Sequence, residues 1–188
     1  MLQRGLPALV LSLAILASAC GRKEAPSGGK ASGGAAPPSA AGKGAAAPAA
    51  GGDLVTDKAL VDGRLVTVEH SKWDIGQTAD LFDPDPGTLA RTAKANPAII
   101  EIDFPDPRPL KGVMLKMGGA GFRVVATVQP AGGGAPRTYT KEFPDPTLDP
   151  ELDLDFDGDL GPAESIRVEV FALRPGDGHI HIRTLRLR

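Results

Sequence analysis

Apolar and polar residues alternate over many short stretches of this chain, and glycine, proline or aspartate follows most of them within a few residues. In the clearest stretch, residues 98–104 (AIIEIDF), isoleucine and phenylalanine alternate with Glu101 and Asp103. Such alternation is typical of a β-strand with one buried and one solvated face. No segment shows a sustained apolar period of 3.6 residues, so the chain is predicted to be all-β.

The same alternation predicts further strands between the turn signals. They are expected at residues 65–69, 112–117, 123–128, 138–143, 152–156, 165–173 and 179–187. Trp73–Gly76 either closes the first of these strands or starts a loop, and the prolines at 105–109 predict a corner. Short strands separated by glycine turns indicate an antiparallel β-sandwich.

The last predicted strand changes its apolar face part-way along. Ile180 and Ile182 share one face of a regular strand, whereas Leu185 and Leu187 share the other. One additional residue in the strand would return all four side chains to the same face. We therefore expect a β-bulge near residues 183–184.

The N-terminus has the features of an exported protein. Arg4 precedes an apolar run at residues 6–16, which is followed by small residues at 17–19 and by Cys20, the only cysteine. A stretch of this length is a secretory signal, because a membrane span needs about 20 apolar residues. Its end resembles the lipobox of bacterial lipoproteins, which implies a lipid on the thiol of Cys20. The alternative is an ordinary signal peptide followed by a chance cysteine.

Residues 21–52 contain almost only alanine, glycine, proline, serine and a few lysines. Such a segment lacks the large apolar side chains that would offset the entropy lost on ordering, so it is predicted to be a disordered tether. The expected organisation is a signal peptide at 1–19, the lipidated Cys20 and tether at 20–52, and a β-sandwich at 53–188. The protein is thus expected in the cell envelope as a membrane-anchored lipoprotein, at the outer membrane or facing the periplasm in a Gram-negative host.

The charge of the folded part excludes one class of partner. Residues 53–188 hold 16 lysines and arginines against 22 aspartates and glutamates, a net charge of −6. Nucleic-acid binding depends on a basic surface, so we do not expect a nucleic-acid partner.

One short motif carries a family resemblance. Residues 81–90 read LFDPDPGTLA and precede the long core strand. They resemble the A-F-D-G-D-P-x-T-x-W pattern of discoidin-like, galactose-binding-like domains, although Pro84 replaces the glycine and Ala90 the tryptophan. The resemblance implies a discoidin-like jelly roll, a fold that often serves as a carbohydrate-binding or adhesion module.

The resemblance also implies a structural calcium ion at this motif. Its ligands would be Asp83, Asp85 and Thr88, together with a C-terminal glutamate, in whose place this chain has Thr184. Oxygen ligands of this kind suit calcium. The alternative is that Asp83 and Asp85 accept hydrogen bonds from the turn's own amides.

Two other patterns suggest metal sites, but their context argues against both. Residues 153–164 (DLDFDGDLGPAE) satisfy the calcium-loop pattern D-x-D-x-D-G-x5-E, yet no amphipathic helix flanks them. We predict instead a strand with an acidic outer face. His179 and His181 would share one face of a strand, but zinc needs a third fixed ligand, so we expect solvated histidines there.

Sugar binding would require an exposed aromatic platform beside fixed polar groups. Trp73 and Tyr139 are the candidate platforms, and Arg91 is a candidate hydrogen-bond donor to hydroxyls or to an acidic sugar. Trp73 and Arg91 flank the 83–91 turn in sequence, so we expect a ligand to bind at the loop end that contains this turn. For each of them, burial or a surface ion pair is the alternative.

Catalysis is not expected. The folded part has two serines, Ser71 and Ser165, and neither lies in a G-x-S-x-G elbow. The two resemblances, to the lipobox and to discoidin-like domains, imply a lipid-anchored carbohydrate-binding or adhesion module. The alternative is a non-catalytic protein–protein or structural module of the envelope without a sugar ligand.

Overall fold

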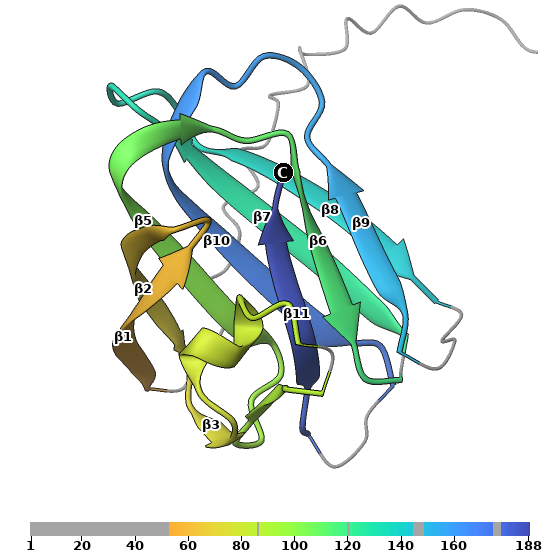
Figure 1. Cartoon of the computed structure of the whole chain (residues 1–188). Coiled ribbons are helices and arrows are strands. Elements are labelled where there is room, and N and C mark those ends of the chain that lie inside the picture. The colour runs from red at the N-terminus through yellow and green to blue at the C-terminus, as the bar shows by residue number, and fades with distance from the viewer. Residues whose placement is uncertain (1–52, 86, 120, 145–148, 175–177) are drawn as a thin grey trace, which may run out of the picture. The chain divides into compact units, whose positions relative to one another are not determined.

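The computed structural model describes residues 53–85, 87–119, 121–144, 149–174 and 178–188. The strands are β1 (Leu54–Val61), β2 (Arg64–Ser71), β3 (Trp73–Ile75), β4 (Ala90–Thr92), β5 (Ala98–Pro109), β6 (Gly112–Met117), β7 (Phe122–Pro130), β8 (Arg137–Phe143), β9 (Glu151–Asp155), β10 (Pro162–Ala172) and β11 (His181–Leu187). They form a six-stranded sheet of order β1-β2-β5-β10-β7-β8 and a five-stranded sheet of order β3-β4-β11-β6-β9 (Figure 1). Every strand pair is antiparallel, so the predicted β-sandwich is confirmed.

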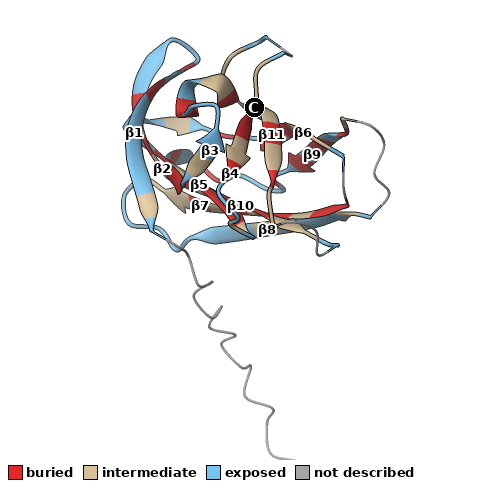
Figure 2. Ribbon diagram, turned by 90° about the horizontal axis from the view of Figure 1, so that it is seen from below, coloured by how far each residue is buried: buried red, intermediate tan, exposed pale blue. Residues whose placement is uncertain are grey.

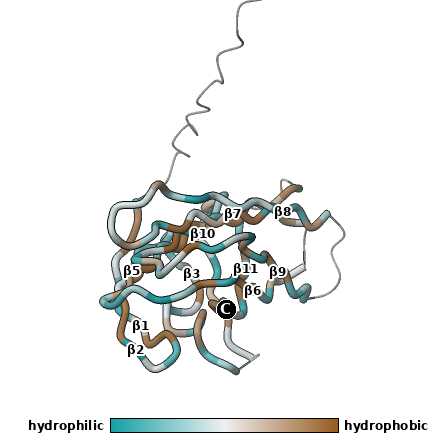
Figure 3. Tube along the Cα trace, turned by 90° about the horizontal axis from the view of Figure 1, so that it is seen from above, coloured by the Kyte–Doolittle hydropathy of each residue, from teal (hydrophilic) through white to brown (hydrophobic). Residues whose placement is uncertain are grey.

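The core lies between the two sheets and follows the alternation of the sequence. In β5, Ile100 and Ile102 are completely buried, whereas Asp103 points outward. The buried positions of both sheets face one another in the ribbon coloured by burial (Figure 2), and hydrophobic and hydrophilic bands alternate along the strands (Figure 3). Each completely buried aliphatic side chain contributes about 1.5–3 kcal/mol to folding.

The predicted bulge in the last strand is present. The register between β11 and β6 shifts between Ile182 and Thr184. Ile180, Ile182, Leu185 and Leu187 are consequently all buried on the inner face. The bulge lets one strand keep a single apolar face despite its change of phase.

The first strand, β1, was not predicted. It is an edge strand, and most of its residues are exposed, so its sequence shows little alternation. It pairs with β2 through a two-residue turn at Asp62 and Gly63, whose φ angles are 50° and 76°. Asp-Gly favours this turn, because both positions require positive φ.

The prediction of a corner at residues 105–109 is wrong. These prolines extend β5 to Pro109, beyond Asp103, the last β5 residue that pairs with β2. The partner β10 is irregular here, since its register shifts between Ala163 and Ser165. Proline lacks an N–H group, and strands tolerate it where regular ladder bonds are already interrupted.

Between β2 and β5 the chain builds an edge of the five-stranded sheet. Trp73–Ile75 forms β3 and pairs with β4, another strand that was not predicted. A short 3-10 helix, η1 (Thr78–Leu81), connects them and buries Leu81. No helix among the described residues is long and apolar enough to cross a membrane.

The acidic segment that contains Asp153 and Asp155 is a strand, β9, as predicted. In β9, Leu152 and Leu154 are buried, whereas Asp153 and Asp155 are exposed. Both aspartates lie close to Arg188, at 3.5 and 2.7 Å from its Nη2 atom. This segment therefore has the acidic outer face that the alternation indicated.

Candidate functional site

Several connections meet at the end of the sandwich where β2 ends and β5 begins, the lower end in Figure 1. The β4–β5 connection, residues 93–97, lies against the end of β2, because the Ala93 N–H donates to the Lys72 carbonyl at 2.8 Å. The two segments enclose a pocket of about 340 Å³, which we call the loop-end pocket. Its lining residues are Asp53, Ser71, Lys72, Ala93, Lys94, Ala95, Asn96 and Pro97.

The β4–β5 connection is fixed at its two ends. Lys94 has a φ of 58°, an uncommon value for a residue with a side chain, and its N–H donates to the Thr92 carbonyl at 3.0 Å. The Asn96 side chain accepts the Ala172 N–H of β10 at 3.1 Å and donates to the Ala172 carbonyl at 3.5 Å. The pocket wall is thus attached to both sheets.

Polar groups of both charges face the loop-end pocket. Lys72 and Lys94 are exposed, and neither forms an ion pair with any residue that the structure describes. The Ser71 hydroxyl is buried and accepts the Ile99 N–H at 2.9 Å, which leaves its own hydrogen available as a donor. Asp53 adds one carboxylate. These groups can donate to an anionic or carbonyl oxygen and accept from a hydroxyl.

Trp73 lies beside this pocket in sequence but is engaged within the protein. Its ring is half-buried and stacks on the His70 ring, with centroids 4.8 Å apart and planes 7° from parallel. Its Nε1–H donates to Thr78 Oγ1 at 3.3 Å. One face of the predicted aromatic platform is therefore covered.

The groups below Trp73 form a polar network that we call the Trp73 cluster: Asp57, His70, Trp73 and Thr78. Thr78 Oγ1 lies 2.6 Å from Asp57 Oδ2 and 2.7 Å from His70 Nε2, and Asp57 Oδ2 lies 3.1 Å from His70 Nε2. Hydrogen bonds from Thr78, and next from His70, lower the pKa of Asp57 below its usual value. The cluster joins β1, β2, β3 and η1.

The Trp73 cluster does not have the arrangement of a catalytic triad. His70 Nδ1 lies 2.9 Å from the Ser71 carbonyl and donates to it, because a carbonyl can only accept. Asp57 and Thr78 both contact the other ring nitrogen. In a triad the carboxylate and the nucleophile contact opposite nitrogens of the ring. The network is suited to holding the edge strand in place.

Arg91 is also engaged. Its Nε and Nη2 atoms donate to the two carboxylate oxygens of Asp74, both at 2.8 Å. This bidentate bond is the main reason that the pKa of Asp74 is lowered. The alternative considered for Arg91, a surface ion pair, is thus observed.

The two histidines near the C-terminus do not share a strand face. His181 begins β11, whereas His179 precedes it and donates from Nδ1 to the Thr92 carbonyl at 2.6 Å. The same nitrogen lies 3.6 Å from Asp74, and only 13% of the His179 side chain is exposed. The expectation of a solvated His179 is therefore wrong, because its ring lies against Thr92 of β4 and Asp74 of β3.

Tyr139 is far from the other predicted ligand residues. It lies on β8, at the opposite edge of the six-stranded sheet from β1 (Figure 1). Its ring stacks on Phe156 with centroids 4.7 Å apart, and its hydroxyl donates to the Asp157 carbonyl at 3.2 Å. The structure brings Trp73 and Arg91 onto adjacent strands but separates Tyr139 from both.

The turn with the calcium motif uses its oxygens on its own backbone. Asp83 Oδ1 accepts the Asp85 N–H, and Asp85 Oδ1 accepts the Gly87 N–H, both at 2.8 Å. The Thr88 hydroxyl donates to the Asp85 carbonyl at 2.8 Å. This is the arrangement in which the aspartates cap turn amides.

The surroundings of this turn do not fit a calcium ion. Pro84 lies in one pocket with Thr184, the residue that replaces the glutamate of the resembling family, so the two segments do meet. That pocket is also lined by Lys116, Arg186 and a single acid, Glu151. No group of three acidic, histidine or cysteine side chains that could hold a metal occurs among the described residues.

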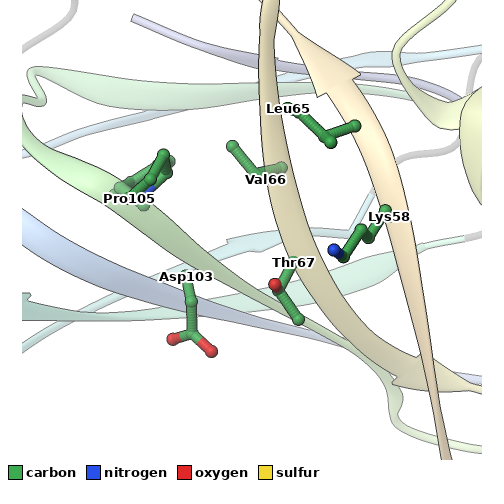
Figure 4. A pocket seen from close by; sticks show the side chains of 7 residues that line it. Lys58, Leu65, Val66, Thr67, Asp103 and Pro105 are labelled. Carbon is green, nitrogen blue, oxygen red and sulfur yellow. The ribbon is translucent and has the colours of Figure 1, made fainter.

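A second hollow lies on the outer face of β1, β2 and β5, and we call it the sheet groove (Figure 4). Its volume is about 270 Å³, and it is lined by Lys58, Leu65, Val66, Thr67, Asp103, Phe104 and Pro105. Thr67 pairs with Lys58 on one side and with Asp103 on the other. Desolvation, and next the charge of Glu101, raise the pKa of Asp103.

Comparisons with known proteins identify the fold. No family model and no curated protein matches the chain. Among solved structures, CpGH89CBM32-4 from Clostridium perfringens, in complex with GlcNAc-alpha-1,4-galactose, is 16% identical over 64% of this chain and 87% of its own, with a TM-score of 0.50. The GH29 fucosidase of Ruminococcus gnavus, in complex with fucose, is 13% identical over 65% of this chain, with a TM-score of 0.52.

The domain has a discoidin-like fold. The matched region spans only 25% of the fucosidase chain, so the likeness concerns one domain of that enzyme. The structural similarity establishes the architecture of the discoidin-like domain. Because the sequence identities are low, the ligand of this domain has to be argued from its own residues. The resemblance first found at residues 81–90 is thus confirmed at the level of the fold.

The polar residues of the loop-end pocket were not singled out in the sequence. Lys72 directly precedes Trp73, and Lys94 and Asn96 lie just before the core strand. Their only local signal is the Asn-Pro turn at 96–97, which marks a connection and not a site. Their convergence depends on the pairing of distant segments.

Proposed function

We propose that the discoidin-like domain is a carbohydrate-binding module and that the loop-end pocket holds the sugar. The observation that carries the proposal is the pair of lysine side chains in this pocket, Lys72 and Lys94, for which no ion pair with a described residue is formed. Lys72 lines this hollow of about 340 Å³ from the end of β2, and Lys94 and Asn96 line it from the β4–β5 connection. Loops held by a rigid sheet commonly carry binding residues.

The comparisons support a sugar as the ligand class. CpGH89CBM32-4, which shares this fold, was solved in complex with GlcNAc-alpha-1,4-galactose. In the present chain, Trp73 lies beside this pocket in sequence while it stacks on His70, and Arg91 is bonded to Asp74. Because few side chains converge, we propose a weak site with a dissociation constant in the range of about 1 µM to 1 mM.

A glycan array followed by calorimetry tests this proposal. The mature full chain, in detergent, should bind a defined set of glycans, and Lys72→Ala and Lys94→Ala should each weaken binding at least about tenfold. Lys58→Ala, in the sheet groove, is the matched control and should bind as the wild type does. Absence of any glycan binding, or equal losses in all three variants, would contradict the proposal.

We also propose that the mature protein is anchored in the cell envelope through a lipid on Cys20. Cys20 lies outside the described residues, so this proposal rests on the small residues at 17–19 and the apolar run before them. Mass spectrometry of the membrane fraction should show an acylated N-terminal peptide, and Cys20→Ala should leave the precursor unprocessed. A soluble mature protein with a free thiol at Cys20 would contradict it.

A protein partner is the second candidate function, and one observation favours it. Leu60 and Leu65 face each other on the β1–β2 hairpin, and 65% and 56% of their surfaces are exposed. Exposed apolar residues beside a groove are typical of interaction sites. Under this alternative, Leu60→Ser with Leu65→Ser would abolish cell-surface recruitment of a partner that the lysine variants still recruit.

A further inference from the structure

We infer that the loop-end pocket selects sugars that carry a carboxylate, such as uronic acids, over their neutral counterparts. This inference rests on the proposed function and adds the chemical class of the ligand.

The two pocket lysines contrast with the arginines of the domain that are engaged in ion pairs. The other described lysines form no ion pair either, so what is particular to Lys72 and Lys94 is that both line one pocket. Five arginines are engaged in ion pairs with aspartate or glutamate, namely Arg91, Arg108, Arg167, Arg183 and Arg188. Lys72 and Lys94 form no ion pair with a described residue, although the domain has an excess of six acidic groups. Two such ammonium groups around one pocket form a local positive region.

A carboxylate is the anionic group that this region suits. Lysine ammonium groups donate up to three hydrogen bonds each, and charge-assisted bonds to a carboxylate are about twice as strong as neutral ones. The buried Ser71 hydroxyl offers a further donor at the pocket wall. Together they can satisfy both oxygens of one carboxylate.

The remaining lining groups indicate a sugar and not a bare anion. Asp53 would repel an isolated anion, but it can accept hydrogen bonds from ring hydroxyls. With two lysines and one aspartate, the lining carries a net charge of about +1, which matches one carboxylate per sugar. The net charge of −6 on the domain also disfavours a highly charged polymer such as nucleic acid.

Calorimetry with matched sugar pairs tests the inference. Oligosaccharides of galacturonic and of glucuronic acid are compared with their neutral galactose and glucose counterparts, using the mature full chain at low and at physiological salt. We expect each favoured acidic sugar to bind at least about tenfold more tightly than its neutral counterpart, and this advantage to shrink as salt rises. Sodium acetate, the anion alone, should show no binding at the same concentrations.

Lys72→Gln and Lys94→Gln should each remove most of the advantage of the acidic sugar, whereas Lys58→Gln should leave it unchanged. All three lysines are exposed, so melting temperatures should stay at the wild-type value. Equal binding of acidic and neutral sugars would overturn the inference while leaving carbohydrate binding intact. Absence of binding to either class would overturn the proposed function as well. Equal loss in Lys58→Gln, or equal binding of acetate, would show a nonspecific charge effect and overturn the inference.

Discussion

Two groups of polar side chains lie next to each other at the β2–β3 junction, and they differ in what they are bonded to. In the Trp73 cluster, the polar atoms of the Trp73, His70 and Thr78 side chains and one carboxylate oxygen of Asp57 each have a partner within 3.3 Å. In the loop-end pocket, Lys72 and Lys94 have no ion pair among the described residues. The first group stabilises the fold, and we propose that the second binds a ligand.

The difference follows from burial. His70 and Thr78 are 2% exposed, and a buried polar group without a partner costs about 1–3 kcal/mol, so the fold must satisfy them internally. An exposed lysine is solvated by water and needs no such partner. Residue types associated with binding, such as tryptophan and arginine, therefore serve the structure here, whereas two less distinctive lysines remain open.

The largest expected effect concerns Trp73. Trp73→Ala removes the ring that stacks on His70 and the donor to Thr78, so we expect the free energy of unfolding to fall by about 2–3 kcal/mol. Trp73→Phe keeps a ring and loses only the hydrogen bond, which corresponds to about 1 kcal/mol. Urea denaturation measures both values. A Trp73→Ala variant as stable as the wild type would show that the ring is a free platform and not part of the fold.

The next effect concerns the pH dependence of Asp57. Its folded-state pKa lies below the ordinary value of 3.8, so its ionised form contributes stability above that pH, and the contribution is lost as pH falls through the folded-state pKa. Asp57→Asn should be less stable than the wild type by about 1 kcal/mol at pH 7. The difference should disappear in strong acid. Thermal unfolding between roughly pH 2 and pH 7 measures this stability difference, because an aspartate with a lowered pKa changes its charge within that range.

Asp103 on the sheet groove provides a control of opposite sign. Its folded-state pKa is raised, so stability is lost as pH rises from 3.8 through that higher pKa. Asp103→Asn should therefore remove this loss and stabilise the protein slightly at neutral pH. If Asp57→Asn stabilised the protein as Asp103→Asn does, the assignment of Asp57 to a stabilising network would be wrong.

Calcium should have the smallest effect. A ligand at 100 times its dissociation constant would stabilise the fold by about 2.7 kcal/mol. Because Asp83 and Asp85 are bonded to turn amides beside Lys116 and Arg186, we expect no shift in melting temperature between millimolar calcium and EDTA. A calcium-dependent shift that Asp83→Asn and Asp85→Asn abolish would restore the metal site.

The fold was largely predictable from the sequence because its core strands alternate. The pattern at 98–104 identified β5, and the phase change between Ile182 and Leu185 located the bulge. β1 was missed because an edge strand exposes most residues and so shows no alternation. The prolines at 105–109 led to the wrong prediction of a corner, because the strand that contains them pairs irregularly with β10 at this point.

The site was less predictable because its character depends on partners that are distant in sequence. Trp73 was recognised as a candidate platform, but nothing local indicates that His70 stacks on it or that Asp57, thirteen residues earlier, bonds to His70. Lys72 and Lys94 become a pair only when β2 and the β4–β5 connection pack side by side. Residue types in the sequence can thus suggest a site, but the hydrogen-bond partners in the folded protein determine which of its polar side chains are already bonded within the fold.

The most direct test of the central claim is an NMR titration of the labelled mature chain with a glycan that it binds. The account predicts that the largest chemical-shift changes fall on the backbone amides of Lys72, Lys94 and Asn96. Amides of the sheet groove, at Leu65, Thr67 and Asp103, should remain unchanged. Changes centred on the groove, with the loop-end pocket unaffected, would contradict the claim that the ligand binds between β2 and the β4–β5 connection.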